Sequence, residues 1–327
     1  PPTIPPVTPL AAARAIEANV LRVIRGKDEA VRLALVALFS GGHLLIEDVP
    51  GTGKTVLARA LARSLDADFR RLQCTQDLLP SDVTGVTVFD PQAGTFSFKQ
   101  GPVFTDVLLA DEINRATPRA QSALLESMEE RQVTADGETH PLSERFFVVA
   151  TQNPVELEGT FPLPEAQLDR FALQIRLGYP SLDALVEILA DQSMAHPLDS
   201  LQSVVSAEDL SAIQAAVRAV RLDRSLARYL GEVVEATREP EEIVLGASPR
   251  AAIWLARAAR AHAFLLERDH VLPDDVQAVA HWVLDHRLIL SPRARLAGAT
   301  ARSMVAVALE QVPVPLAPGV DPPPPAA

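Results

Sequence analysis

The stretch that decides the fold of this chain is His43-Leu-Leu-Ile-Glu-Asp-Val-Pro-Gly-Thr-Gly-Lys-Thr55. Its apolar beginning, residues 43–46, predicts a buried strand, and an apolar-periodic helix is predicted to begin near Lys54. A glycine-rich loop between a strand and a helix turns successive backbone N–H groups inward around phosphate oxygens, and the positive end of the helix dipole adds to the attraction. We therefore interpret this loop as the phosphate-binding part of a nucleotide site.

Two side chains at the start of the predicted helix suit this interpretation. Lys54 is expected to reach the outer phosphates, and the hydroxyl of Thr55 can ligate Mg²⁺. A lysine in the first turn of a helix lies at the unfavourable end of the helix dipole unless an anion is present, so a solvated surface turn is the weaker alternative. The match is imperfect, because Asp48 stands where the usual signature has its first glycine.

The composition indicates a globular chain with one large and one smaller domain. Of its 327 residues, 48% are hydrophobic and 22% are charged, so a sizeable core can be buried. The formal net charge of −12 gives no general reason to bind nucleic acid or an anionic membrane. The single cysteine, Cys74, is expected to be a small buried apolar side chain. No stretch resembles a signal peptide or a bilayer span, so we expect a cytoplasmic protein without membrane insertion.

The hydrophobic pattern divides the chain into two domains between proline-rich ends. Residues 1–9 and 313–327 are proline-rich tails, residues 10–179 form the predicted α/β domain, and residues 180–312 form the predicted helical domain. Apolar strands are expected at residues 43–46, 69–73, 107–110, 146–150 and 172–177. Helices are expected at residues 10–24, 28–40, 181–194, 206–221, 224–237, 249–267 and 273–286. This alternation predicts a parallel sheet flanked by helices, and no strand is expected after Gly178.

Two hairpins are predicted to interrupt the alternation. One covers residues 86–98 and the other covers residues 133–140, where Asp136-Gly137 marks the turn. Each could be a solvated edge ribbon, or a moving element that faces a partner.

An acidic motif follows the first hairpin, where the apolar run from Val107 ends in Asp111 and Glu112. In an enzyme with a phosphate loop, Asp111 would hold Mg²⁺ through its water shell, and Glu112 would polarise the attacking water as a general base. We expect this strand to lie beside the strand that precedes the loop.

Three more polar side chains are candidates for nucleotide contacts. Asn153 ends another apolar strand and could orient water, although it could also simply form a turn. Arg170 could stabilise transition-state charge in the site of a neighbouring subunit, or pair with Glu165 or Asp169. Arg250 is a cation at a helix start, a position that an anionic ligand would make favourable.

These motifs, in this order, resemble the AAA+ ATPases, and specifically the MoxR family within the helix-2-insert group, over residues 20–290. The most specific phrases are EDVPGTGKT, LQCTQDLLPSDVTG, ADEINRATPRAQSALLESMEERQVT, TQNPVELEGTFPLPEAQLDRF and GASPRA. The resemblance implies Walker A at residues 51–55, Walker B at Asp111 and Glu112, sensor 1 at Asn153, an arginine finger at Arg170 and sensor 2 at Arg250. It also implies that adenine lies near Val23 and Ile24. The full set of nucleotide contacts that it implies is Val23, Ile24, Pro50, Gly51, Thr52, Gly53, Lys54, Thr55 and Val56.

The resemblance also implies a function and two cofactors, ATP and Mg²⁺. Proteins of this family are similar to ring-forming, usually hexameric, chaperone-like ATPases that mature or assemble client proteins, often with partners that carry a von Willebrand factor A domain. Two alternatives stay open. One is a nucleotide-gated ring scaffold with slow hydrolysis, against which the intact Glu112 and Arg170 argue. The other is a DNA-remodelling or chelatase-type relative, which the acidic charge disfavours.

Overall fold

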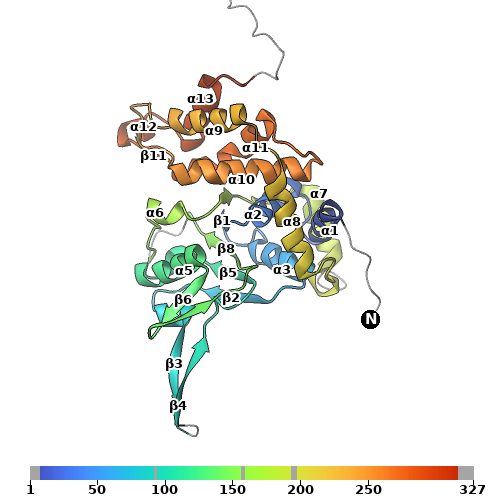
Figure 1. Ribbon diagram of the computed structural model, residues 1–327, viewed down its shortest axis with the longest axis vertical. Coiled ribbons are helices and arrows are strands. Elements are labelled where there is room, and N and C mark those ends of the chain that lie inside the picture. Colours follow the sequence, from blue (N-terminus) through green and yellow to red (C-terminus); the bar gives the residue numbers. More distant parts are fainter. Residues whose placement is uncertain (1–7, 92–93, 156–158, 193–196, 316–327) are drawn as a thin grey trace, which may run out of the picture. The chain divides into compact units, whose positions relative to one another are not determined.

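The computed structural model describes residues 8–91, 94–155, 159–192 and 197–315 (Figure 1). The chain divides into two compact units, Pro1–Val217 and Arg218–Ala327, which are described separately below. This division falls within a helix, whereas the sequence places a domain boundary near residue 180, and that boundary stays a prediction. The predicted proline-rich tails lie mostly outside the described residues.

Unit 1 is built on a parallel sheet of five strands in the order β2-β5-β8-β1-β9. The strands are β1 (Leu44–Glu47), β2 (Phe69–Gln73), β5 (Val107–Asp111), β8 (Phe147–Gln152) and β9 (Leu173–Ile175). The predicted parallel sheet is confirmed. The expectation that the acidic strand lies beside the loop strand is wrong, because β8 separates β5 from β1. A crossover connection can pass over a position that a later strand then fills, so chain order alone does not fix neighbours.

Helices cover both faces of this sheet, and Figure 1 shows α5 (Pro118–Glu130) on the opposite side from α1 (Pro9–Leu21), α2 (Asp28–Phe39) and α3 (Lys54–Ser64). Side chains of a strand alternate between the two faces. On the α5 side a buried core forms from strand and helix side chains that include Leu45, Leu108, Val148, Leu124 and Leu125. The sheet is therefore a buried middle layer, as its nearly continuous apolar strands require.

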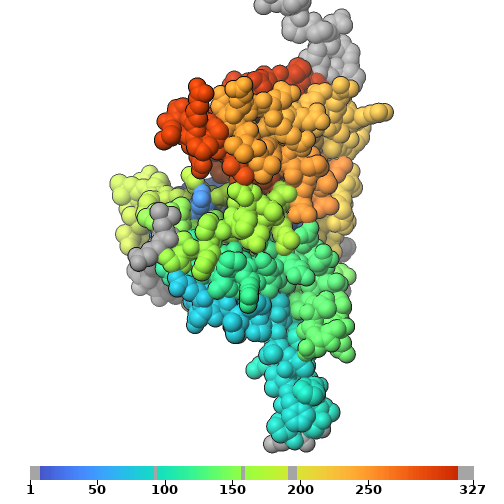
Figure 2. Space-filling model, turned by 90° about the vertical axis from the view of Figure 1, so that its left-hand side faces the viewer, coloured from blue at the N-terminus to red at the C-terminus, as the bar shows by residue number. Residues whose placement is uncertain are grey.

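Both predicted hairpins are present in unit 1. They are β3 (Gly85–Asp90) with β4 (Thr95–Gln100), and β6 (Gln132–Ala135) with β7 (Glu138–Pro141). The first hairpin stands out from the rest of the unit (Figure 2), and Phe89 and Phe96 face each other on it with ring centroids 5.0 Å apart. At its base, Phe98 stacks on His140 of the second hairpin at 4.1 Å, so the two hairpins are in contact.

The remaining elements of unit 1 are either short or come after the last strand of the sheet in the chain. They are α4 (Pro80–Thr84), η1 (Ile113–Arg115), α6 (Glu165–Leu168), α7 (Leu182–Gln192), η2 (Pro197–Ser200) and α8 (Ala207–Ala219). Cys74 is buried in the core, as expected, and burial raises the pKa of its thiol to about 12. Among the described residues, no helix has both the length and the apolarity that crossing a membrane requires.

Unit 2 is mainly helical, as the sequence predicts. Its helices are α9 (Arg224–Ala236), α10 (Pro249–Leu265), α11 (Pro273–Leu284), η3 (Asp285–Arg287), α12 (Pro292–Leu296) and α13 (Ala301–Gln311). The expectation of no strand after residue 178 is wrong, because β10 (Ile243–Leu245) pairs antiparallel with β11 (Ile289–Leu290). Strands of three and two residues are too short to show a period of two in the sequence.

Candidate nucleotide-binding site

The loop between β1 and α3 has an open inner surface. Gly51 and Gly53 have φ angles of 82° and 93°, in the left-handed region that other residues adopt at a cost. No heavy atom lies within 4 Å of the position that a Cβ atom would take at either glycine. Because Gly53 directly precedes the first residue of α3, the loop opens at the N-terminus of a helix, which is where phosphate binds in many proteins. The residues present therefore fit a nucleotide phosphate.

Lys54 is folded back onto this loop. Its Nζ donates to the backbone oxygens of Asp48 at 2.7 Å and Val49 at 2.9 Å. Burial lowers the pKa of its ammonium, and the charges of Asp48, Asp111 and Glu112 oppose that shift. The ammonium thus lies beside the loop, where the charges of these three carboxylates act on it. Thr55 follows on α3 and is half-buried.

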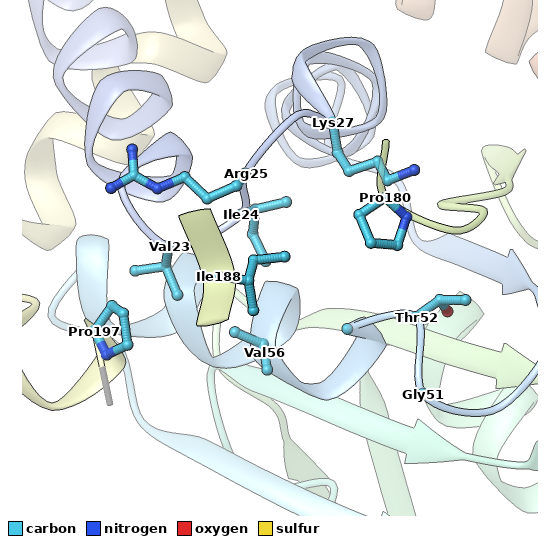
Figure 3. Close-up of a pocket in the computed structure, with 11 residues that line it drawn as sticks. Val23, Ile24, Arg25, Lys27, Gly51, Thr52, Val56, Pro180, Ile188 and Pro197 are labelled. Carbon is cyan, nitrogen blue, oxygen red and sulfur yellow. The ribbon is translucent and has the colours of Figure 1, made fainter. Parts of the chain in front are cut away.

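A pocket of about 210 Å³ lies next to the loop (Figure 3). Its wall consists of Val23, Ile24, Arg25, Lys27, Gly51, Thr52, Gly53, Val56, Pro180, Ile188 and Pro197. Six of these are among the nine nucleotide contacts expected from the sequence, whereas Pro50, Lys54 and Thr55 lie next to the pocket along the loop. The apolar side chains of Val23, Ile24, Val56 and Ile188 offer faces suited to a flat base.

Figure 3 shows that the pocket wall comes from separate segments of unit 1. The connection between α1 and α2 supplies Val23, Ile24, Arg25 and Lys27, whereas α7 and its flanking segments supply Pro180, Ile188 and Pro197. Sequence reasoning missed the α7 side, since nothing in the apolar spacing of that helix indicates which face meets a ligand.

The two acids at the end of β5 are held by Thr151 of β8. The hydroxyl of Thr151 donates to Oδ1 of Asp111 at 2.7 Å and accepts from the backbone N–H of Glu112 at 2.8 Å. Glu112 adopts a left-handed conformation with φ of 57°, which costs free energy for a residue other than glycine. Thr151 is fully buried. This hydroxyl therefore fixes both acids at once, and a threonine inside an otherwise apolar strand was the available signal.

Strand β2 adds a second set of contacts to the same acids. Arg71 donates from Nε and Nη2 to Oδ2 of Asp111 at 3.1 and 2.6 Å. Gln73 donates from Nε2 to Oε2 of Glu112 at 3.2 Å, and Arg115 lies 3.4 Å from the same oxygen. Sequence reasoning missed Arg71 and Gln73, because polar residues alternating along a strand read as an exposed face.

The other predicted side chains are placed as follows. Asn153 is buried, and its Oδ1 accepts from the backbone N–H of Val155 at 3.1 Å, which forms a turn. The Nδ2 group is the hydrogen-bond donor of this side chain. Arg170 forms an ion pair with Glu129 of α5 at 3.0 Å, a partner that the sequence did not indicate. Arg250 lies in the first turn of α10 in unit 2, and its role stays a prediction.

The loop after β1, the acids after β5 and Asn153 after β8 all lie at carboxyl ends of parallel strands of one sheet. This edge is where ligands bind in open α/β sheets. The oxygens of Asp111 and Thr55 are of the kind that Mg²⁺ prefers, and Mg²⁺ usually keeps waters and substrate phosphates as its other ligands.

Comparison with known proteins agrees with this geometry. Residues 43–173 match the family described as ATPase family associated with various cellular activities (AAA), and residues 235–306 match the AAA lid domain. The fold and the two matches define the class as AAA+.

Relatives along most of the chain narrow the class further. The chain is 48% identical to the YeaC protein of Bacillus subtilis, over 93% of this chain and 94% of that protein. It is 42% identical to the chaperone MoxR1 of Mycobacterium tuberculosis, over 84% of this chain and 74% of that one. A crystal structure of a "putative ATPase" from Cytophaga hutchinsonii has a TM-score of 0.88 at 40% identity, covering 94% of this chain and 96% of its own. The chain belongs to the MoxR family of AAA+ ATPases.

Proposed function

We propose that this MoxR-family protein binds ATP with Mg²⁺, hydrolyses it at interfaces between subunits of a ring, and uses the cycle to remodel, mature or assemble partner proteins. The observation that carries the proposal is the convergence of three motifs on one edge of the sheet. There the open phosphate loop, the acids held by Thr151 and the buried Asn153 lie at neighbouring strand ends.

Each residue has a role that follows from its chemistry. The backbone N–H groups of the loop bind phosphate oxygens, and Lys54 neutralises their outer charge once its ammonium leaves the carbonyls of residues 48 and 49. Glu112 accepts a proton from water as a general base, and Nδ2 of Asn153 orients that water. Mg²⁺, held by Thr55 and Asp111, would neutralise phosphate charge. Val23 and Ile24 pack against the base in the adjoining pocket.

Arg170 is the residue that makes the proposed site a shared one. Its guanidinium belongs to an ion pair with Glu129 on α5, and α5 lies on the opposite side of the sheet from α3, which follows the phosphate loop (Figure 1). A cation placed there can act on the site of a neighbouring subunit, where positive charge stabilises the transition state of phosphoryl transfer. A hexameric ring is the assembly we propose.

Exchanging Glu112 for glutamine tests the proposed hydrolysis. Glu112→Gln keeps the size of the side chain and removes the base, so ADP and ATP binding should persist while turnover falls by about 10²-fold or more. The matched control is Glu126→Gln, which alters an exposed acid on α5 and should leave both properties unchanged. Full turnover in Glu112→Gln would refute the general-base role.

The remodelling role is supported by the name of the relative MoxR1, which is called a chaperone. The exposed aromatic pair on the first hairpin is a surface that a protein client could contact. A partner with a von Willebrand factor A domain stays a prediction from the resemblance. A ring scaffold with slow hydrolysis would instead show ATP-dependent assembly without turnover, and a DNA-remodelling protein would show salt-dependent DNA binding.

A further inference from the structure

Asp48 is the one departure from the usual phosphate-loop signature, and the structure shows what its carboxylate does. Asp48 is buried, with 8% of its surface exposed. Oδ1 accepts from the backbone N–H of Val49 at 2.8 Å, and Oδ2 accepts from the backbone N–H groups of Leu177 at 2.9 Å and Gly178 at 2.6 Å. A glycine at this position could make none of these three hydrogen bonds.

Both oxygens of the carboxylate accept from backbone N–H groups, two of which belong to the segment that follows β9. An anion inside a phosphate site would repel the ligand, but here three N–H donors stabilise the charge. Hydrogen bonds to an ionised acceptor are stronger than those between neutral groups. Asp48 is therefore tied to the segment that follows β9, and its backbone oxygen still accepts from Lys54.

The segment that Asp48 holds leads directly to the pocket. Gly178, with φ of 65°, is followed by Tyr179, whose backbone oxygen accepts from Nζ of Lys27. Pro180 and Lys27 both line the pocket, and Figure 3 shows them side by side. One chain of contacts thus runs from the phosphate loop through Asp48 and residues 177–180 to the wall where the base would lie.

Helix α7 extends this chain of contacts to the connection between α1 and α2 and to the pocket. A Cβ atom at Gly26 would lie 2.8 Å from Cβ of Ala184, so the connection between α1 and α2 packs tightly on the first turns of α7. Ile188, one turn further along α7, lines the pocket. Lys27, Pro180 and Ile188 form the side of the pocket that we call the base-binding wall. A shift of residues 177–180 would therefore move this wall and the start of α7 together.

We propose that Asp48 is a positioning residue that couples the phosphate loop to the base-binding wall, so that phosphate binding fixes residues 177–180 and the start of α7. This inference rests on the proposed nucleotide site and deepens it, since it names the route by which nucleotide state reaches the segment beyond β9. The phosphates order the loop, the loop orders the carboxylate of Asp48, and the carboxylate orders the two N–H groups that it accepts from.

Amide hydrogen exchange measures this coupling directly, because the two N–H groups in question belong to Leu177 and Gly178. The variant is Asp48→Ala, whose methyl group cannot accept a hydrogen bond. Asp48→Gly, which restores the usual signature, is a second variant with a different effect on folding. The control is Glu47→Gln, which removes a neighbouring acid whose partner is the exposed Arg176. ADP is the probe, and its binding to each protein is measured first by titration.

We expect ADP to slow exchange at both N–H groups in the wild-type protein and in Glu47→Gln. In both Asp48 variants the same groups should exchange at least about tenfold faster without ligand, because charge-assisted hydrogen bonds are lost. ADP should then slow their exchange far less, and should bind at least about tenfold more weakly. A merely structural role would speed exchange in the free protein but leave the slowing by ADP intact.

The outcomes separate this inference from the proposed function. Failure of the wild-type protein to bind ADP would overturn the nucleotide site, and the coupling with it. Binding of ADP with equal slowing at Leu177 and Gly178 in the wild-type protein and in either folded Asp48 variant would overturn the coupling alone. Exchange at the wild-type rate in the free variants would show that the carboxylate does not hold these groups.

Discussion

Replacing Thr151 by valine is the most informative single change at the acids, because it removes one hydroxyl and keeps the volume of the side chain. That hydroxyl donates to Asp111 and accepts from the N–H of Glu112. Loss of a hydrogen bond to a charged acceptor costs about 1.5–3 kcal/mol, and leaving a partly buried N–H without its acceptor adds about 1 kcal/mol. The free energy of unfolding should therefore fall by about 2.5–4 kcal/mol.

Thr151→Ser is the matched control, since it keeps the hydroxyl and loses one methyl group at a cost of about 1 kcal/mol. The assay is urea denaturation followed by far-UV circular dichroism. Tryptophan fluorescence would not serve, because Trp254 and Trp282 both lie in unit 2. Turnover should fall in Thr151→Val as well, since the left-handed backbone of Glu112 loses its anchor. Equal stability of the valine and wild-type proteins, or a larger loss in serine than in valine, would refute the reasoning.

Three further predictions follow from single side chains. Burial lowers the pKa of His43 to about 4 from its ordinary 6.5, so its stability contribution is complete above pH 6.5 and is lost as the pH falls toward 4, by up to about 3 kcal/mol. A urea midpoint that depends on pH in this range as strongly in His43→Gln as in the wild-type protein would contradict this. Arg170→Ala should change the free energy of unfolding by less than about 1 kcal/mol, because the ion pair with Glu129 is partly exposed. It should nevertheless lower the turnover rate by about 10³-fold. Turnover at the wild-type rate would refute the proposal that Arg170 is an arginine finger. Asp275→Asn should destabilise unit 2 by about 3 kcal/mol, because the buried carboxylate accepts from both Nη atoms of Arg268; an unchanged tryptophan-detected transition would contradict that.

The strands and the loop could be predicted because each depends on residues that are close in sequence. The apolar run of residues 43–46 and the glycines that follow it specify a strand, a turn and a helix start without reference to the rest of the chain. The neighbours of β1 could not be predicted in this way. Which strand lies beside β1 depends on the crossover connections and on packing against both helical layers, and the expectation that β5 would do so was wrong.

The same distinction applies to the site. Glu112, Asn153 and Arg170 could be proposed because each ends an apolar run or belongs to a specific phrase. Thr151 and Glu129 are distant in sequence from the groups that they contact. Thr151 is visible only as a hydroxyl in an otherwise apolar strand, and nothing local indicates that it would reach the acids or that Glu129 would pair with Arg170. Asp48 was visible in the sequence only as a departure from the signature. Its role required the positions of Leu177 and Gly178, which are brought to it by the pairing of β1 with β9.

The central claim, ATP hydrolysis at a site shared between subunits, is tested most directly by turnover per subunit as a function of protein concentration. The assay contains Mg²⁺, and the mass of the assembly is determined at each concentration. The account predicts that specific activity rises with the assembled fraction, and that Arg170→Ala stays inactive even when it is fully assembled. Constant specific activity from the monomer upward would contradict the shared site.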